Sequence, residues 1–158
     1  MNETEDAGGV EVPEGAKEAR KPQPIALRIV AHGTPASQGS KKAFKRGKKI
    51  VLVEMDEELP AWRDTIVAAA KQAAGDQWQP IDRPVKVSGE IRIRKPGATK
   101  FKDHPAGPKD LDKLQRAIGD SLESAAILTN DARICHWDIR KVWALDVPGM
   151  DITITETP

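Results

Sequence analysis

Residues 85–93 alternate between apolar and polar side chains, and this alternation constrains the fold more than any other feature of the sequence. Successive side chains of a β-strand point to opposite faces, so such a strand has one buried face and one exposed face. The buried face needs a covering layer, which amphipathic helices elsewhere in the chain can supply. The apolar positions of this expected strand are Val85, Val87, Gly89, Ile91 and Ile93.

The sequence predicts two helices, over residues 58–74 and 110–125, because apolar side chains recur there at intervals of three and four. Gly75 is a natural end for the first helix, and Pro60 fits its first turn. Gly119 lies inside the second helix at a cost of about 1 kcal/mol relative to alanine, which indicates close packing at that point. The apolar stripe of the second helix consists of Leu111, Leu114, Ile118, Leu122 and Ala125.

Other segments predict further strands, near residues 25–31, over residues 135–145 and after residue 149, together with a hairpin over residues 41–53 that turns at Gly47. The order strands, helix, strand, helix, strands predicts an α/β domain of the α+β type. We expect two layers, a mixed sheet with both helices on one face. Side chains expected on the covered face of the strand over 135–145 are Cys135, Trp137, Ile139, Trp143 and Leu145.

Charge is unevenly distributed along the chain, although the formal net charge is only +1. Residues 1–22 carry six acidic and three basic side chains and almost no large apolar residue, which predicts a disordered acidic tail. Residues 23–158 are expected to form one domain with 22 basic and 18 acidic side chains. A mildly basic domain suits a nucleic-acid partner without requiring one.

Cysteine usage and hydropathy narrow the class of protein. Cys135 is the one cysteine, which excludes a disulfide within the chain and a zinc site built from cysteines. No apolar run approaches the roughly 18 residues that a membrane span needs. The N-terminus has no basic start followed by an apolar stretch, so a secretory signal is not indicated. We therefore expect a cytoplasmic protein without a membrane partner.

Asp110 and Asp112 open the second expected helix, and Asp131 follows that helix in a turn. An extended backbone at a helix entrance points residues i and i+2 to the same side, where both carboxylates can meet a hard cation such as Mg²⁺. The alternative is structural, since acids favour helix N-termini and Asp131 suits an ordinary turn. Spacing alone leaves both interpretations open.

Basic residues surround these acids. Arg116 lies four residues after Asp112, where it can contact a phosphate or form a weak ion pair within the helix. Lysine clusters attract phosphate backbones by counterion release, although a run of charges also suits a solvated surface. The candidate DNA-binding residues are Lys41, Lys42, Lys45, Arg46, Lys48, Lys49, Lys109 and Lys113.

Residues 109–122, K-D-L-D-K-L-Q-R-A-I-G-D-S-L, followed by N-D-A-R-I at residues 130–134, resemble the signature of the RusA family of Holliday-junction resolvases. That signature reads D-[LI]-D-N-L-x-K-x-x-x-D-x-L, then a D-D-[AS]-x-[IV] turn leading into a strand. Residues 33–41, G-T-P-A-S-Q-G-S-K, are similar to the N-terminal loop of phage and actinobacterial members. The resemblance spans about residues 24–156.

The resemblance implies a small homodimeric endonuclease that depends on Mg²⁺, with Mn²⁺ as a substitute. It implies that four-way branched DNA is bound and that two opposing strands are nicked symmetrically, in recombination and repair within a bacterial or phage-infected cell. Asp110, Asp112 and Asp131 would be the catalytic acids and metal ligands. Arg116 takes the position of the family's functional lysine and counts with them as catalytic.

Three positions depart from the family signature. Arg116 keeps the positive charge of lysine but presents a planar fork and cannot donate a proton. Lys113 stands where the signature has asparagine, and Asn130 stands at the first aspartate of the turn. Because positions 113 and 116 lie beside the expected active centre, they motivate an alternative, a non-catalytic branched-DNA-binding protein of the same fold.

Overall fold

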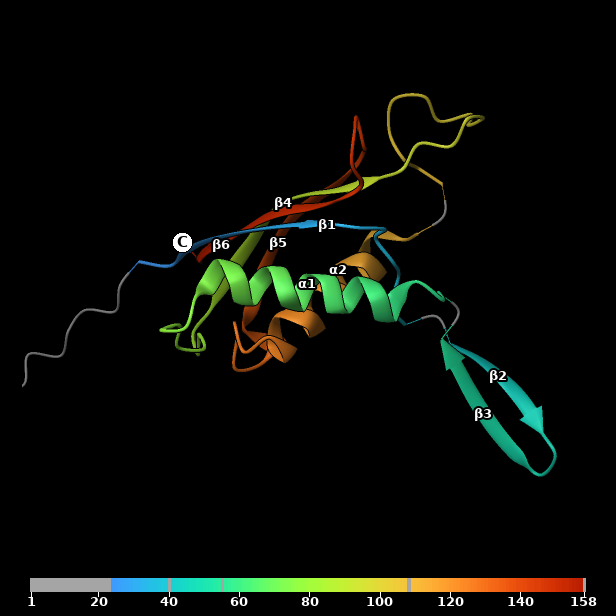
Figure 1. Cartoon of the computed structure of the whole chain (residues 1–158), viewed down its shortest axis with the longest axis horizontal. Coiled ribbons are helices and arrows are strands. Elements are labelled where there is room, and N and C mark those ends of the chain that lie inside the picture. Colours follow the sequence, from blue (N-terminus) through green and yellow to red (C-terminus); the bar gives the residue numbers. More distant parts are fainter. Residues whose placement is uncertain (1–23, 40, 55, 108, 158) are drawn as a thin grey trace, which may run out of the picture.

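The computed structural model describes residues 24–39, 41–54, 56–107 and 109–157. The acidic tail expected over residues 1–22 lies outside these ranges. Helices α1 (Leu59–Ala74) and α2 (Leu111–Ser124) lie side by side on one face of a four-stranded sheet (Figure 1). The predicted two-layer α+β architecture is therefore confirmed.

The sheet contains β1 (Ala26–His32), β4 (Val85–Ile93), β5 (Ile134–Trp143) and β6 (Gly149–Glu156), in the order β1-β6-β4-β5. β6 pairs antiparallel with both β1 and β4, whereas β5 pairs parallel to β4. Parallel neighbours need a long crossover connection, and here that crossover contains α2. The two acids that open α2 are therefore carried by the crossover.

The core lies between the helices and the covered face of the sheet. The alternation predicted for β4 is observed, since Val85, Val87 and Ile91 are fully buried. The apolar stripe of α2 faces them, and α1 contributes Trp62, the largest buried side chain. Burying one large apolar side chain stabilises the fold by about 1.5–3 kcal/mol, so this interface positions α2 firmly against the sheet.

Gly89 allows β4 to pass close to β6. Its φ is +139°, and an added Cβ would lie 2.1 Å from the backbone oxygen of Asp151, an atom that cannot rotate away. We expect Gly89→Ala to destabilise the fold by about 2–4 kcal/mol, measured by urea denaturation. The control is Gly97→Ala, because nothing lies within 4 Å of a Cβ added at Gly97. Equal destabilisation of both variants would contradict this steric explanation.

Three expectations for the segment over residues 135–145 are wrong. Cys135 is exposed, and Leu145 lies beyond the end of β5 and is fully exposed. Trp143 is only partly buried, and its Nε1 donates a hydrogen bond to the carbonyl oxygen of Phe101 at 3.1 Å. The pairing of β4 with β5 skips Cys135 at a register shift, since Val85 pairs with Ile134 and Lys86 with His136, whereas Trp143 and Leu145 lie at the end of an edge strand. Ile139, in the middle, is buried as expected.

A separate hairpin projects from the body of the protein (Figure 1). It consists of β2 (Lys41–Arg46) and β3 (Lys49–Glu54), which pair antiparallel. The chain turns at Gly47, whose φ is +64°, as the sequence predicts. Every residue of β2 is exposed, so the hairpin is not part of the core.

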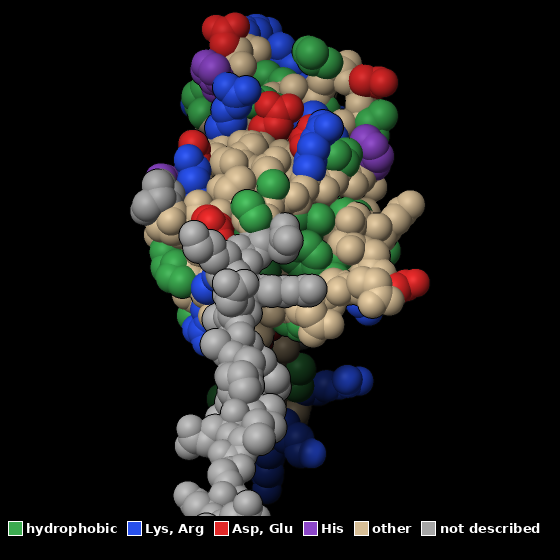
Figure 2. All heavy atoms as spheres, turned by 90° about the vertical axis from the view of Figure 1, so that its left-hand side faces the viewer, with side chains coloured by type: hydrophobic (Ala, Val, Ile, Leu, Met, Phe, Trp, Pro, Cys, Tyr) green, Lys and Arg blue, Asp and Glu red, His purple; other side chains and the backbone are tan. Residues whose placement is uncertain are grey.

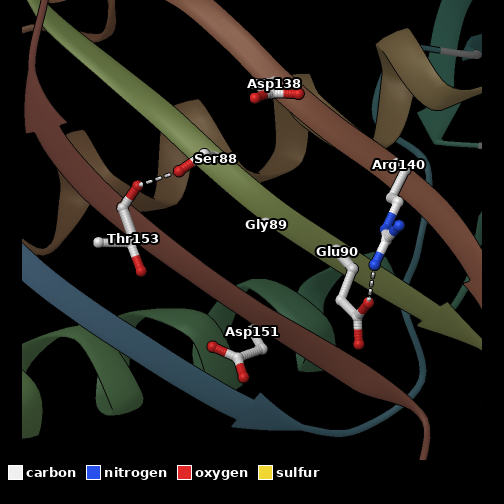
Figure 3. A pocket seen from close by; sticks show the side chains of 7 residues that line it. All are labelled: Ser88, Gly89, Glu90, Asp138, Arg140, Asp151 and Thr153. Atoms are coloured by element: carbon white, nitrogen blue, oxygen red, sulfur yellow. Dashed lines mark hydrogen bonds and ion pairs between the residues drawn. The ribbon is translucent and has the colours of Figure 1, made fainter.

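The face of the sheet opposite the helices is open and polar. A shallow cavity of about 490 Å³ lies over β4, β5 and β6 (Figure 3). Its charges are largely paired: Glu90 accepts from Arg140 at 3.4 Å, and Asp151 forms an ion pair with Arg28 at 2.6 Å. The hydrogen bond from Arg28 lowers the pKa of Asp151. The lining residues are Ser88, Gly89, Glu90, Asp138, Arg140, Asp151 and Thr153, none of which the sequence singles out for catalysis.

Candidate active site

The loop over residues 33–39 joins β1 to the hairpin and runs along α2. The backbone amide of Gln38 donates to the carbonyl oxygen of Lys113 at 3.1 Å, and its side-chain amide donates to the carboxylate of Asp120. Gly39 lies against the guanidinium of Arg116, because a Cβ added at Gly39 would be 3.1 Å from Nη1. The loop therefore packs on the face of α2 that carries Arg116 and Asp120.

Asp110 and Asp112 lie at the entrance of α2, as predicted. Asp110 is the residue before the first turn and has an extended backbone, with φ −62° and ψ 136°. Its side chain makes no capping hydrogen bond and instead forms an ion pair with Lys113 at 3.2 Å. Asp112 is exposed in the first turn. The capping role that the structural alternative gives to Asp110 is therefore absent, while the helix dipole still favours both charges.

Asp131 begins the short 3-10 helix η1 (Asp131–Arg133), which returns the chain to α2. The side chain of Asn130 makes the turn's capping bond, by accepting from the Ala132 amide at 2.9 Å. The amide of Asp131 donates to the carboxylate of Glu123 at 3.0 Å. A Cβ added at Gly119 would lie 3.6 Å from the Asp131 Cβ, so the close packing expected at Gly119 is observed.

Asp120 is a carboxylate that the sequence reasoning did not assign, and it lies beside Asp131. The pKa of Asp131 is raised, first by partial burial, then by the hydrogen bond and charge of Asp120, and then by the charge of Glu123. The Ala132 amide opposes this shift. Two such carboxylates favour a shared proton or a bound cation. The available signal was the RusA signature, whose third aspartate falls at position 120.

A protein-family model described as Endodeoxyribonuclease RusA matches residues 32–155, which include both helices and most of the sheet. The chain belongs to the RusA family of endodeoxyribonucleases. This membership identifies the protein as a nuclease that acts on DNA and confirms the resemblance carried by residues 109–134. A search of curated proteins found no match. Among the helices in the described ranges, none is both long and apolar enough to cross a membrane.

The fit of the RusA-type acids to a metal ion depends on how closely they lie together. In the part of the chain that the structure describes, no three His, Cys, Asp or Glu side chains are arranged to hold one ion. Asp112 and Asp120 are eight residues apart, or about 12 Å along the helix axis. The donor chemistry nevertheless suits Mg²⁺, which needs only one or two carboxylates plus substrate phosphates. The close pair of Asp120 and Asp131 is the feature that fits such a cation.

Lys109, which the sequence predicts to contact DNA, forms hydrogen bonds within the protein at the start of the RusA signature. Its Nζ donates to the carbonyl oxygen of Pro35 at 2.7 Å and to Asp56 at 3.1 Å. Burial raises the pKa of Asp56, but the hydrogen bonds from the Ser37 amide and Lys109 outweigh it, so the net shift is downward. Lys109 therefore joins the loop over residues 33–39, the segment before α1 and the entrance of α2.

Lys141 is a second residue that the sequence reasoning missed. Its Nζ donates to the carbonyl oxygen of Lys109 at 2.9 Å. The alternation along β5 places Lys141 on the covered face between Ile139 and Trp143. A charged side chain at a covered position was the sequence feature that could have singled it out. Lys141 links the edge strand to the residue that precedes Asp110.

We expect Asp120→Asn to lower the pKa of Asp131, because the substitution removes a neighbouring negative charge and leaves burial in place. A raised pKa means that the Asp131 contribution to stability is present at low pH and is lost as the pH rises through the folded-state pKa. The titration of the carboxyl carbon by NMR without metal measures the shift. Asp138→Asn, on the opposite face of the sheet, is the control. An unchanged Asp131 titration in Asp120→Asn would contradict the coupling.

Proposed function

We propose that this protein is a Mg²⁺-dependent endonuclease that resolves four-way DNA junctions by paired symmetric nicks, in DNA recombination and repair. The observation that carries the proposal is the position of Asp131 beside Asp120. Asp120 lies on the helix that presents Asp112 and Arg116, and η1 brings Asp131 against it, within a domain of an endodeoxyribonuclease family. The substrate is DNA in the cytoplasm of a bacterial or phage-infected cell.

In this proposal Asp110, Asp112 and Asp131 are the ligands of one or two Mg²⁺ ions, which Mn²⁺ can replace. Asp110 and Asp112 act at the entrance of α2, and Asp131 acts further along the helix with the support of Asp120. The bound ion supplies Lewis-acid stabilisation of phosphoryl oxygens and lowers the pKa of water. The acids must be ionised to bind it, so activity falls at acid pH. Protons compete with the ion at Asp131, because its pKa is raised by burial and by Asp120.

Arg116 acts on the phosphate in this proposal. Its guanidinium lies against Gly39 and so is positioned by the loop over residues 33–39. A planar fork can donate two hydrogen bonds to a phosphate and stabilise the negative charge that develops on the leaving oxygen. Arg116 does not supply a proton, so the leaving oxygen takes its proton from solvent.

A homodimer is part of the proposal. Each chain carries one set of Asp110, Asp112 and Asp131, and therefore one cutting site. Two nicks on opposing strands of a four-way junction need two such sites, related by the two-fold symmetry of the junction.

The non-catalytic alternative remains a second candidate, because one observation favours it. Lys113 stands where the family signature has asparagine, and its ammonium pairs with Asp110 at 3.2 Å. A lysine in this position can satisfy a carboxylate that would otherwise bind a metal. A protein altered in this way would still bind branched DNA.

The test is a cleavage assay with an end-labelled four-way junction, in Mg²⁺, in Mn²⁺ and in EDTA. We expect paired nicks at symmetric positions on opposing strands in either metal and none in EDTA. A linear duplex of the same sequence is the control and should stay uncut. Binding without nicks across all metals and pH values would support the non-catalytic alternative and overturn the proposed enzyme.

A further inference from the structure

The β2–β3 hairpin exposes large apolar side chains among its basic ones. Phe44 is 51% exposed, Val51 39%, Ile50 75% and Leu52 64%. Single exposed apolar residues are common, but Phe44 and Val51 are paired across the two strands, and such a contiguous apolar pair on a projecting element indicates a binding surface. The space-filling view shows Lys and Arg side chains together with hydrophobic ones on the part that extends below the body (Figure 2).

The pairing register divides the hairpin into two faces. Phe44 pairs with Val51, and Arg46 pairs with Lys49, so these four side chains share one face. Lys42 lies on the same face, because it is two residues before Phe44. We call this surface the Phe44 face; it consists of Lys42, Phe44, Arg46, Lys49 and Val51.

The hairpin emerges beside the candidate active site. Residues 38 and 39, which precede β2, contact α2: Gln38 donates to Asp120, and Gly39 lies against Arg116. Asp56, which follows β3, forms an ion pair with Lys109 at 3.1 Å. DNA whose phosphate contacts Arg116 therefore passes the root of the hairpin.

The distance along the chain limits what the Phe44 face can reach. Phe44 is five residues from Gly39, so the two are at most about 17 Å apart along an extended chain. At 3.4 Å per base step, this distance corresponds to about five steps of DNA. Phe44 can therefore contact bases only close to the phosphate held by Arg116.

We propose that the Phe44 face binds the branch point of the DNA, with the Phe44 ring stacked on an unstacked base and the three cations on the flanking phosphates. Cations select a polyanion, but phosphates give an exposed phenyl ring no partner, whereas a base offers a π-face. Continuous duplex keeps its bases stacked, while a branch interrupts the stack. Apolar side chains are used in this way as wedges between base steps. The inference rests on the proposed function, since it names the feature of the substrate that is recognised.

A second copy of the chain is a weaker candidate for this surface. The Phe44 face carries Lys42, Arg46 and Lys49, so two copies packed face to face would bring six cations together. Like charges placed opposite each other destabilise paired strands. Phosphates neutralise the same cations, so charge complementarity favours DNA.

The experiment measures binding of the full chain in EDTA to a four-way junction and to a linear duplex of the same sequence. Phe44→Ala should weaken junction binding about tenfold and change duplex binding less than about twofold, whereas Phe44→Trp should retain junction binding. A 2-aminopurine base at the branch point should change fluorescence with the wild type and with Phe44→Trp, but not with Phe44→Ala.

Leu52→Ala is the matched control, because it removes an exposed apolar side chain from the other face of the same strand pair. It should leave junction binding unchanged. Equal losses in Leu52→Ala and Phe44→Ala, or full junction binding by Phe44→Ala, would overturn the inference. If Phe44→Ala lowered the molar mass of the assembly in solution, the surface would be an interface with a second copy, and the inference would also be overturned.

Binding in EDTA keeps this test separate from that of the proposed function. A protein that binds junctions through Phe44 but never nicks them would refute the enzyme and leave the inference standing. If Phe44→Ala resolved junctions as well as the wild type, the inference would be refuted and the proposed enzyme would stand.

Discussion

Asp112→Asn should abolish cleavage of a four-way junction and leave binding of that junction intact. Asparagine keeps the size of the side chain but lacks the charge that a divalent cation requires. We expect the cleavage rate to fall about a thousandfold, the scale on which loss of a group that stabilises transition-state charge acts. Binding should be equal or tighter, because an exposed carboxylate that repels phosphate is removed.

The fold should survive this change. Asp112 is exposed in the first turn of α2, so its loss costs only the interaction with the helix dipole, about 0.3–1 kcal/mol. Single-turnover cleavage in Mg²⁺ and anisotropy titrations in EDTA separate the rate from the affinity. The control is Asp76→Asn, which removes an exposed acid just beyond the C-terminus of α1. A wild-type cleavage rate for Asp112→Asn would leave Asp112 with a structural role alone.

Replacing Lys45, Arg46, Lys48 and Lys49 by glutamine should weaken DNA binding by orders of magnitude at low salt. All four side chains are exposed on the hairpin. Each phosphate contact contributes about 0.9 to the slope of log affinity against log salt, so losing four contacts should reduce that slope by about 3 to 4. Duplex and junction should be affected alike, because phosphates are common to both.

Titrations between 50 and 200 mM salt give this slope. A variant with glutamine at Lys86 and Arg140 is the control, because both lie on the open face of the sheet, away from α2. Its slope should stay close to that of the wild type. If the hairpin variant also keeps the wild-type slope, the four cations are solvated charges that do not contact DNA.

Much of the fold could be predicted because periodicity reports burial directly. The alternation in β4, the stripe of α2 and the turn at Gly47 each depend on neighbouring residues alone. The parallel pairing of β4 with β5 could not be predicted, since alternation has no direction and strand order is decided by tertiary contacts. The position of Cys135 was wrong because the register shift between β4 and β5 interrupts the alternation there, and the position of Leu145 was wrong because β5 ends at Trp143.

The candidate site was predictable where the motif is local. Asp110, Asp112 and Arg116 lie within seven residues of sequence, and the structure places them on one helix and its entrance. Lys109 forms an ion pair with Asp56, which is far away in the sequence, so this ion pair could not be predicted. The signature marks Asp120, but its role beside Asp131 appears only when η1 brings Asp131 against α2.

The parallel crossover also fixes when during synthesis this nuclease can first cut. The contacts that shape the entrance of α2 come from Pro35 at one extreme and Lys141 at the other. A nascent chain must therefore emerge from the ribosome past β5, and β5 must pair with β4. Only then can Lys141 bind the carbonyl oxygen of Lys109 and complete the contacts around that residue. We expect unfinished chains to carry the acids without a formed site, so that they leave the DNA near them uncut.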